Sequence, residues 1–312
     1  MNILFCTEKW CDASPNRGLT NNFHNLFNSF EQSRPNDTIN TLHLDECSLV
    51  YGRSIDSILL SYCSQNKTDV VIFSLLGDSP LNPSIETIKA LKSVGIKTVF
   101  MWPDTSRWAI GQIVSLDGIA DLSVSWDNAY SQTHNSFKYP DNHINLWVPQ
   151  DHSMFSFVYQ SGKSIDVSFI GSVYSDRAMF LGNSSKNISI YGGQRNKRLS
   201  SYEYANIIKN SKISINFPLS PCGSFHQIKG RVYEIFSCGS MLLERKNPVT
   251  SKLFVPGQDY IEFDSVKEMD DAIEHFVNNE YDRERISISG CIKYINFYGS
   301  KKFWDAIINE IY

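Results

Sequence analysis

The chain has 312 residues, 42% of them hydrophobic and 20% charged, with a formal net charge of −4, which predicts a globular protein of about two domains. The slight negative charge disfavours proteins that bind nucleic acids through a broadly basic surface, and seven cysteines without a C-x-x-C pair argue against a disulfide framework and a zinc site. The N-terminus has no signal-peptide pattern and no stretch of about 18 apolar residues occurs, so we expect a cytoplasmic protein without a transmembrane segment.

Short apolar runs alternate with helical patterns along the first 150 residues. The apolar runs predict strands at 2–6, 39–44, 69–76, 97–102 and 120–126, and helical spacing predicts helices at 18–30, 53–65, 83–94 and 106–116. Because these strands are hydrophobic along their whole length, we expect a parallel sheet that helices cover on both faces.

A strand, a proline and a polar Gly/Ser stretch interrupt this alternation at 144–164, which is typical of a linker. The pattern then resumes, with strands predicted at 165–172, 187–193, 212–219, 239–244 and 258–263, and helices at 174–182, 201–210, 228–237 and 267–279.

The predicted fold class is therefore α/β, with two tandem Rossmann-like domains that face a cleft. The boundaries we expect are an N-terminal domain at 1–155, a C-terminal domain at 156–295 and a terminal helix at 296–312 that packs back through its apolar face. Open parallel sheets bind ligands beyond the carboxyl ends of their strands, so these edges should carry the functional residues.

A charged helix, "KGRVYEIFSCGS" at 229–240, follows one such strand edge. Lys229 and Arg231 lie near the predicted N-terminus of the helix, where unpaired N–H groups and the helix dipole already favour a diphosphate. Glu234 lies about one turn further and has the reach to accept hydrogen bonds from the vicinal hydroxyls of a ribose. The alternative is an exposed Arg/Glu pair worth a few tenths of a kcal/mol. Diphosphate and ribose contacts together indicate a nucleotide site.

The same segment carries a family resemblance. "KGRVYEIFSCGSMLLE" followed by "LFVPGQDYIEFDSVKEMDDAIEHFVNN" resembles the C-terminal, donor-binding half of GT-B glycosyltransferases, in particular the group-1-type, CgeB-like branch. "FIGSVYSDR" at 169–177 resembles the opening strand, glycine turn and arginine of that half, and "LWVPQDHSMF" at 146–155 resembles the segment that joins the two halves. The resemblance covers roughly residues 144–290, whereas the first domain is similar in architecture only.

The resemblance implies a glycosyltransferase that moves a sugar from a nucleotide-diphosphate sugar, with UDP as the expected carrier, to a hydroxyl acceptor. It implies that Glu234 binds the ribose. Arg177, Lys229 and Arg231 are then expected to bind the diphosphate. The donor is expected to approach the backbone closely at the turn formed by Gly171 and Ser172.

His226 departs from the pattern of retaining relatives, which often carry two glutamates eight positions apart. His226 stands at the earlier of these positions, so we expect it near the sugar as a catalytic candidate, and the retaining or inverting outcome stays open. An alternative is a loop histidine without a chemical role.

The chemistry itself favours cations over a metal ion at this site. Cleavage of a sugar–phosphate bond builds negative charge on the departing diphosphate, which preorganised cations and helix dipoles stabilise. The sequence contains no Asp-x-Asp motif and no His/carboxylate spacing typical of a ligand set, so we expect no metal and no cofactor beyond the donor substrate.

The first domain is expected to hold the acceptor, a glycan or another hydroxyl compound. Glu8 follows the first strand and Asp104 follows the strand at 97–102, so either carboxylate is a candidate general base. Tryptophans commonly stack on sugars. The acceptor-binding candidates are Arg17, Gly18, Trp102 and Arg107. The secondary candidates in this domain are Asp12, His24, Trp108 and Asp127. The alternative reading of these side chains is as turn residues and partly buried aromatics.

Other functional classes fit less well. The chain lacks the G-x-S-x-G elbow of many hydrolases and the G-x-G-x-x-G turn of dinucleotide oxidoreductases. The main rival is a non-catalytic α/β clamp that holds a nucleotide-sugar or a sugar. A modified DNA base is the less favoured acceptor, since the basic segment at 195–198 favours it and the net charge of −4 disfavours it.

Overall fold

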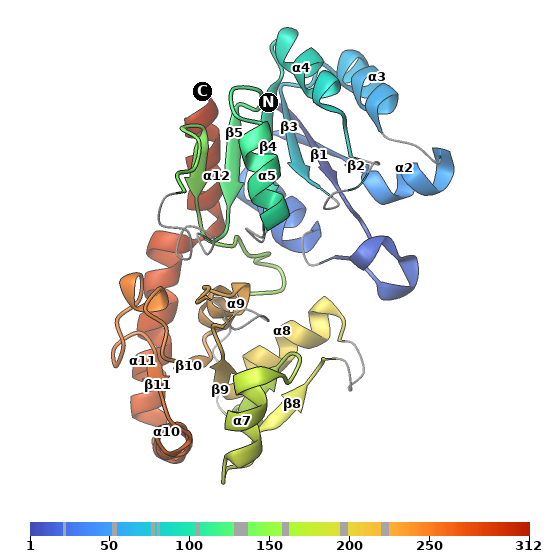
Figure 1. Ribbon diagram of the computed structural model, residues 1–312. Helices are drawn as coiled ribbons and strands as arrows, with labels where there is room; N and C mark the ends of the chain where they lie inside the picture. The colour runs from blue at the N-terminus through green and yellow to red at the C-terminus, as the bar shows by residue number, and fades with distance from the viewer. Residues whose placement is uncertain are drawn as a thin grey trace. The chain divides into compact units, whose positions relative to one another are not determined.

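The computed structural model describes residues 1–20, 23–51, 55–75, 79, 82–103, 107–127, 137–157, 162–193, 199–219 and 225–312 (Figure 1). The chain forms two compact units. Unit 1 comprises Met1–Asp151 and Ser300–Tyr312, and unit 2 comprises His152–Gly299. Unit 1 thus takes in the C-terminal helix that the sequence sets apart as its own segment.

A parallel sheet forms the centre of unit 1. Its strand order is β2-β1-β3-β4-β5-β6. The strands are β1 (Asn2–Thr7), β2 (Thr38–His43), β3 (Val70–Ser74), β4 (Lys97–Trp102), β5 (Leu122–Ser125) and β6 (His143–Asn145). All five residues of β3 are buried, as expected for a central strand covered on both faces.

Helical segments surround this sheet. They are η1 (Cys11–Ala13), η2 (Pro15–Arg17), η3 (Phe23–Asn28), α1 (Ser29–Ser33), α2 (Leu44–Tyr51), α3 (Asp56–Asn66), α4 (Ile85–Ser93), α5 (Arg107–Ser115) and α12 (Ser300–Ile311). The Ser84 side chain caps α4 by accepting a hydrogen bond from the backbone N–H of Thr87.

The C-terminal helix α12 packs into unit 1 through its apolar face. The rings of Trp304 and Phe30 meet edge to face at 4.8 Å, and the indole N–H of Trp304 donates to Ser29 Oγ at 2.9 Å. Phe303, Ile307 and Ile311 join the same buried cluster. The predicted docking of the terminal helix is therefore confirmed.

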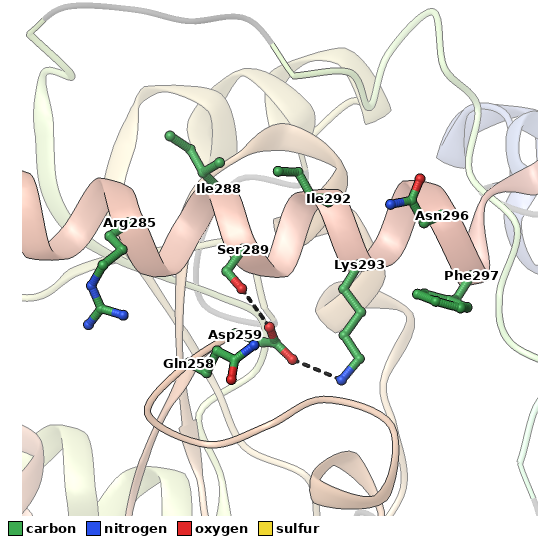
Figure 2. Close-up of a pocket in the computed structure, with 9 residues that line it drawn as sticks. All are labelled: Gln258, Asp259, Arg285, Ile288, Ser289, Ile292, Lys293, Asn296 and Phe297. Carbon is green, nitrogen blue, oxygen red and sulfur yellow. Dashed lines mark hydrogen bonds and ion pairs between the residues drawn. The ribbon is translucent and has the colours of Figure 1, made fainter.

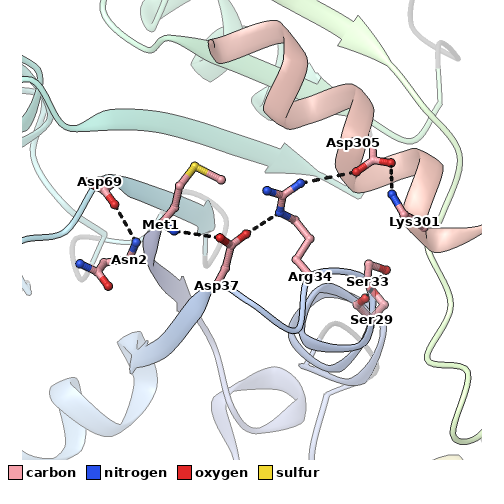
Figure 3. Close-up of polar contacts among 9 residues, drawn as sticks. All are labelled: Met1, Asn2, Ser29, Ser33, Arg34, Asp37, Asp69, Lys301 and Asp305. Atoms are coloured by element: carbon pink, nitrogen blue, oxygen red, sulfur yellow. Dashed lines mark hydrogen bonds and ion pairs between the residues drawn. The ribbon is translucent and has the colours of Figure 1, made fainter.

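A chain of ion pairs fastens α12 to the start of the sheet (Figure 3). The Met1 amino group pairs with Asp37 at 2.8 Å, and Asp37 also pairs with Arg34. Arg34 reaches Asp305 of α12 at 3.5 Å, and Asp305 pairs with Lys301 one turn away. Segments far apart in the sequence are thereby joined at one edge of unit 1.

The sheet of unit 2 is also parallel, with the strand order β11-β10-β9-β7-β8. The strands are β7 (Ile165–Ile170), β8 (Ser189–Tyr191), β9 (Ser211–Asn216), β10 (Met241–Arg245) and β11 (Ile261–Phe263). The chain runs from β7 outward to β8 and then returns to β9 on the other side of β7. The loops after β7 and β9 diverge at this switch point, which is where open α/β sheets bind ligands.

The helical segments of unit 2 are α7 (Ser175–Asn183), α8 (Ser201–Asn210), α9 (Gly230–Cys238), η4 (Thr250–Lys252), α10 (Val266–Asn278), α11 (Glu280–Lys293) and η5 (Tyr294–Tyr298). Ser200 and Glu203 form a capping box at the start of α8. Among the described residues of both units, none of the helices has the length and apolar character needed to cross a bilayer.

Candidate functional site

The predicted donor residues of unit 2 gather at the switch point of its sheet. Gly171 directly follows β7, and its backbone φ of 143° lies where side chains are rarely tolerated. A Cβ atom at this position would lie 3.0 Å from Nη2 of Arg231, a residue in the first turn of α9. The structure therefore brings the glycine turn and one predicted diphosphate ligand together.

Residues of the unit 2 sheet hold the Arg231 side chain in position. Its Nη1 donates to Oδ1 of Asn216, the last residue of β9, at 3.5 Å, and its guanidinium carbon lies 5.6 Å from the ring centre of Phe169. Arg231 is half-buried and the residues under it are fully buried, so its cationic group has a defined position beside the Gly171 turn.

Arg177 joins the two loops that diverge at the switch point. The side chain is buried, and its two terminal nitrogens donate to the backbone carbonyls of Ser172 at 3.2 Å and Phe217 at 3.5 Å. The guanidinium also lies 4.3 Å from the ring centre of Tyr174. Burial lowers the pKa of Arg177, and the charge of Arg231 acts in the same direction. Arg177 thus connects the two loops through its hydrogen bonds. Its predicted contact with phosphate stays a prediction.

Lys229 occupies the N-cap position of α9, and its ammonium group donates to Oε1 of Gln227. Gly193, in the loop after β8, has a φ of 80°, and its Cβ would lie 2.9 Å from the Gly171 carbonyl oxygen. Two glycines therefore allow the loops after β7 and β8 to approach each other closely. The basic segment at 195–198 lies outside the described residues.

Glu234 lies one turn into α9 and is 6% exposed. The phenolic hydroxyl of Tyr204, from α8, donates to its Oε2. Burial raises the pKa of Tyr204, the Glu234 carboxylate raises it further, and a hydrogen bond from Arg231 opposes both effects. Tyr204 therefore links the predicted ribose ligand to the predicted phosphate ligand, and the capping-box sequence around it gave no sign of this role.

His226 lies on the connection from β9 to α9, the same segment that supplies Lys229. Its backbone pairs with Leu219 in an isolated bridge, and its side chain is half-buried. The structure thus places His226 on the loop that carries the donor residues, while its role toward the sugar stays a prediction.

The acceptor candidates of unit 1 differ in their surroundings. Glu8 directly follows β1, on a loop held by the Asp45 carboxylate, which accepts from the backbone N–H groups of Lys9 at 3.0 Å and Trp10 at 2.9 Å. Arg17 and Gly18 are exposed on the same loop, and Gly18 has a φ of 75°.

The prediction that Trp102 binds the acceptor is wrong. Trp102 is 1% exposed and its ring is stacked on Phe100 in the hydrophobic core, so its face is covered by protein rather than presented to a sugar. Asp104 lies outside the described residues, and Arg107 begins α5 with a side chain that is likewise outside them.

A buried carboxylate that sequence reasoning missed lies beside His24. Asp151 is almost fully buried and accepts from Asn28 Nδ2 at 2.9 Å and from Gln32 Nε2 at 2.7 Å, with His24 Nδ1 3.8 Å away. Burial lowers the pKa of His24, and the Asp151 charge opposes this shift. Asp151 belongs to the segment "LWVPQDHSMF", which was the signal available in the sequence.

Unit 2 also has a shallow pocket of about 480 Å³ along α11 and η5 (Figure 2). The residues that line it include Asp259, which accepts from Ser289 at 2.7 Å and from Lys293 at 3.0 Å. The residues that line it do not include the predicted donor ligands. In the described part of the chain, no three or more His, Cys, Asp or Glu side chains are grouped so that they could hold a metal ion.

Comparisons with known proteins give one family match and several structural likenesses. The family model described as "Glycosyl transferase-like" matches residues 153–309. Anabaena HepE, solved in complex with UDP and glucose, has a TM-score of 0.65 at 9% identity, over 99% of this chain and 98% of that chain. Sucrose-phosphate synthase from Thermosynechococcus elongatus has a TM-score of 0.62 at 7% identity, over 99% of this chain and 98% of that chain.

The T4 phage beta-glucosyltransferase has a TM-score of 0.59 at 12% identity, over 100% of this chain and 99% of that chain. No curated protein sequence matches the chain. The structural likenesses confirm the predicted GT-B architecture of two Rossmann-like units, whereas the CgeB-like branch stays a prediction.

Proposed function

The chain belongs to the glycosyl transferase-like family, and we propose that its unit 2 binds a nucleoside-diphosphate sugar whose sugar is transferred to a hydroxyl acceptor. The observation that carries this proposal is the position of Arg231 beside the Gly171 turn at the switch point of the unit 2 sheet. HepE was solved with UDP and glucose, so uridine diphosphate is the first carrier to test.

The diphosphate fits the first turn of α9. Backbone N–H groups at a helix N-terminus point toward an anion, and the helix dipole favours negative charge there. Lys229 and Arg231 add two full positive charges at this end of the helix. Gly171 has no side chain to occupy the space next to Arg231. These groups stabilise the negative charge that builds on the diphosphate as the sugar leaves.

Glu234 is the proposed ribose ligand. Its carboxylate is held by Tyr204, and it lies about one turn along α9 from the proposed diphosphate position. A carboxylate accepts hydrogen bonds from two neighbouring hydroxyls, whereas phosphate would be repelled by it. The cationic first turn of α9 thus suits the anionic diphosphate, and the carboxylate in the next turn suits the hydroxyl groups of the ribose.

We further propose that the leaving group is stabilised by protein cations rather than by a bound metal ion. Turnover that persists in EDTA would agree with this proposal, and turnover that requires added Mg²⁺ or Mn²⁺ would refute it. We also propose a reducing, cytoplasmic setting, which the seven scattered cysteines without a C-x-x-C pair favour.

Unit 1 is the proposed acceptor unit, with a glycan or another hydroxyl compound as substrate. Glu8 and Asp104 are the proposed general bases, and His226 is proposed to contact the sugar from the donor side. A DNA acceptor would show itself by binding that weakens steeply as salt is raised. A product with a new glycosidic bond separates an enzyme from a protein that only holds the donor.

The direct test is a thermal-shift panel of UDP, GDP and ADP and their sugars. We expect one nucleotide series to stabilise the wild type and to lose this effect in Glu234→Ala. Glu274→Ala is the matched control, because Glu274 is an exposed carboxylate of the same unit that pairs with Lys186. Equal stabilisation of the wild type and Glu234→Ala would show that the nucleotide does not bind through Glu234.

A further inference from the structure

A carboxyl group lies completely buried behind the proposed donor site. Glu244 is near the end of β10 and is 0% exposed. It stands directly opposite Asn216 of β9 in the sheet register. A carboxyl group is kept in such a place only when other groups hydrogen-bond to it, so its partners indicate its role.

Asn216 connects Glu244 to the proposed diphosphate ligand. Its Nδ2 donates to Glu244 Oε1 at 2.7 Å, and its Oδ1 accepts from Arg231 at 3.5 Å. The guanidinium fixes which way the Asn216 amide faces, because it has only donors and therefore requires the amide oxygen. A flipped amide would lose the hydrogen bond from Arg231.

A second branch leads from the same carboxyl group toward Lys229. Asn247 Nδ2 lies 3.4 Å from Glu244 Oε1 and also donates to the backbone carbonyl of Gln227 at 3.1 Å. The side-chain oxygen of Gln227 accepts from Lys229. Asn216, Asn247 and Glu244 are all fully buried, so this network has a defined geometry.

We propose that Glu244 is a positioning residue of the donor site, which holds Arg231 toward the diphosphate through the amide of Asn216 and couples donor binding to the charge on its own carboxyl group. This inference rests on the proposed function, since it assigns a role to the residues behind the proposed diphosphate ligand.

The charge on Glu244 changes near neutral pH. Burial raises its pKa to about 7, while hydrogen bonds from Thr250, Asn216 and Asn247 lower it and the charge of Glu262 raises it. The titratable groups that face it are Glu262 and Tyr260 at β11, Tyr233 on α9 and, through Asn216, Arg231.

Above about pH 7 the carboxylate places a negative charge behind Arg231. This charge offsets part of the positive potential that attracts the diphosphate, so donor affinity should fall as the pH rises. UDP-glucose is the appropriate probe, because its phosphates have no terminal group that titrates in this range, whereas the terminal phosphate of UDP does.

The experiment measures the dissociation constant of UDP-glucose by calorimetry between pH 6.0 and 8.5. We expect the constant of the wild type to rise about fivefold over this range, an effect of one buried charge at moderate distance. Glu244→Gln keeps the shape of the side chain without the charge, so its dissociation constant should stay near the low-pH value throughout. His226→Gln should retain the pH slope, which separates the effect of Glu244 from that of the histidine on the connection between β9 and α9.

A second variant covers the case in which Glu244→Gln does not fold. Thr250→Val removes a hydroxyl that lowers the pKa of Glu244, so the midpoint of the pH dependence should move upward. A pH slope in Glu244→Gln equal to that of the wild type, or an unmoved midpoint in Thr250→Val, would overturn this inference alone. No binding of UDP-glucose or of any other nucleotide sugar by the wild type would overturn the proposed function and this inference with it.

Discussion

Gly171 and Arg231 lie so close that a Cβ atom added at position 171 would be in tight contact with the guanidinium group. The Cβ of an alanine at position 171 would stand 3.0 Å from Nη2 of Arg231, and the φ of 143° at this position is one that alanine rarely adopts. The end of β7 and the first turn of α9 are therefore matched to each other at the proposed diphosphate position.

Gly171→Ala should lower donor affinity by about tenfold or more, because the new methyl group displaces the guanidinium and strains the backbone. Calorimetric titration with UDP-glucose measures this effect. Gly182→Ala in α7 is the matched control, since no atom lies within 4 Å of its added Cβ. Unchanged affinity in Gly171→Ala would show that the donor does not use this turn.

Tyr204→Phe should weaken donor binding by about tenfold or more, because a hydrogen bond to a charged group is worth about 1.5–3 kcal/mol and Glu234 would lose its orientation. Tyr202→Phe, on the exposed side of the same helix, should bind the donor as the wild type does. If both variants bind equally well, Tyr204 has no part in presenting Glu234.

Arg177→Lys should lower the free energy of unfolding by about 1–3 kcal/mol, because an ammonium group cannot reach both the Ser172 and Phe217 carbonyls in one plane. Chemical denaturation measures this loss, with the exposed Arg285→Lys as the control. A variant of wild-type stability with reduced UDP affinity would instead make Arg177 a direct phosphate ligand.

Glu244→Gln should change how stability depends on pH. The pKa of Glu244 is raised from 4.5 to about 7 in the folded state, so its favourable contribution is complete below pH 4.5 and is lost as the pH rises through about 7. The variant has no such loss. Its stability relative to the wild type should therefore increase by roughly 3 kcal/mol between pH 4.5 and pH 8. Parallel pH profiles of the two proteins would contradict this burial effect.

Most strands of both sheets could be predicted from the sequence, because buried parallel strands are short apolar runs such as Val70–Ser74. Two helices were missed for physical reasons. α2 begins directly at the end of β2, with no residue between the two elements to mark a boundary. α11 contains Gly290, an unfavourable helix residue that is required here because a Cβ would lie 2.5 Å from the Asp259 carbonyl oxygen.

The candidate site was predictable only where one segment carries several of its residues. Lys229, Arg231 and Glu234 follow one another along α9, so their spacing indicated a site. Tyr204 comes from α8 and Glu244 from β10, so only the fold brings Tyr204 to Glu234 and connects Glu244 to Arg231 through Asn216. Trp102 was misassigned because an apolar ring after a strand fits a core position as well as a sugar platform.

Hydrogen–deuterium exchange with and without UDP tests the central claim most directly, because it reports both whether the nucleotide binds and where. We predict slower exchange at 169–173, which spans the end of β7 and the turn after it, and at 227–234, which spans the approach to α9 and its first residues. Protection confined to unit 1 or to the pocket along 285–297, with none at these two segments, would contradict the assignment of the donor site.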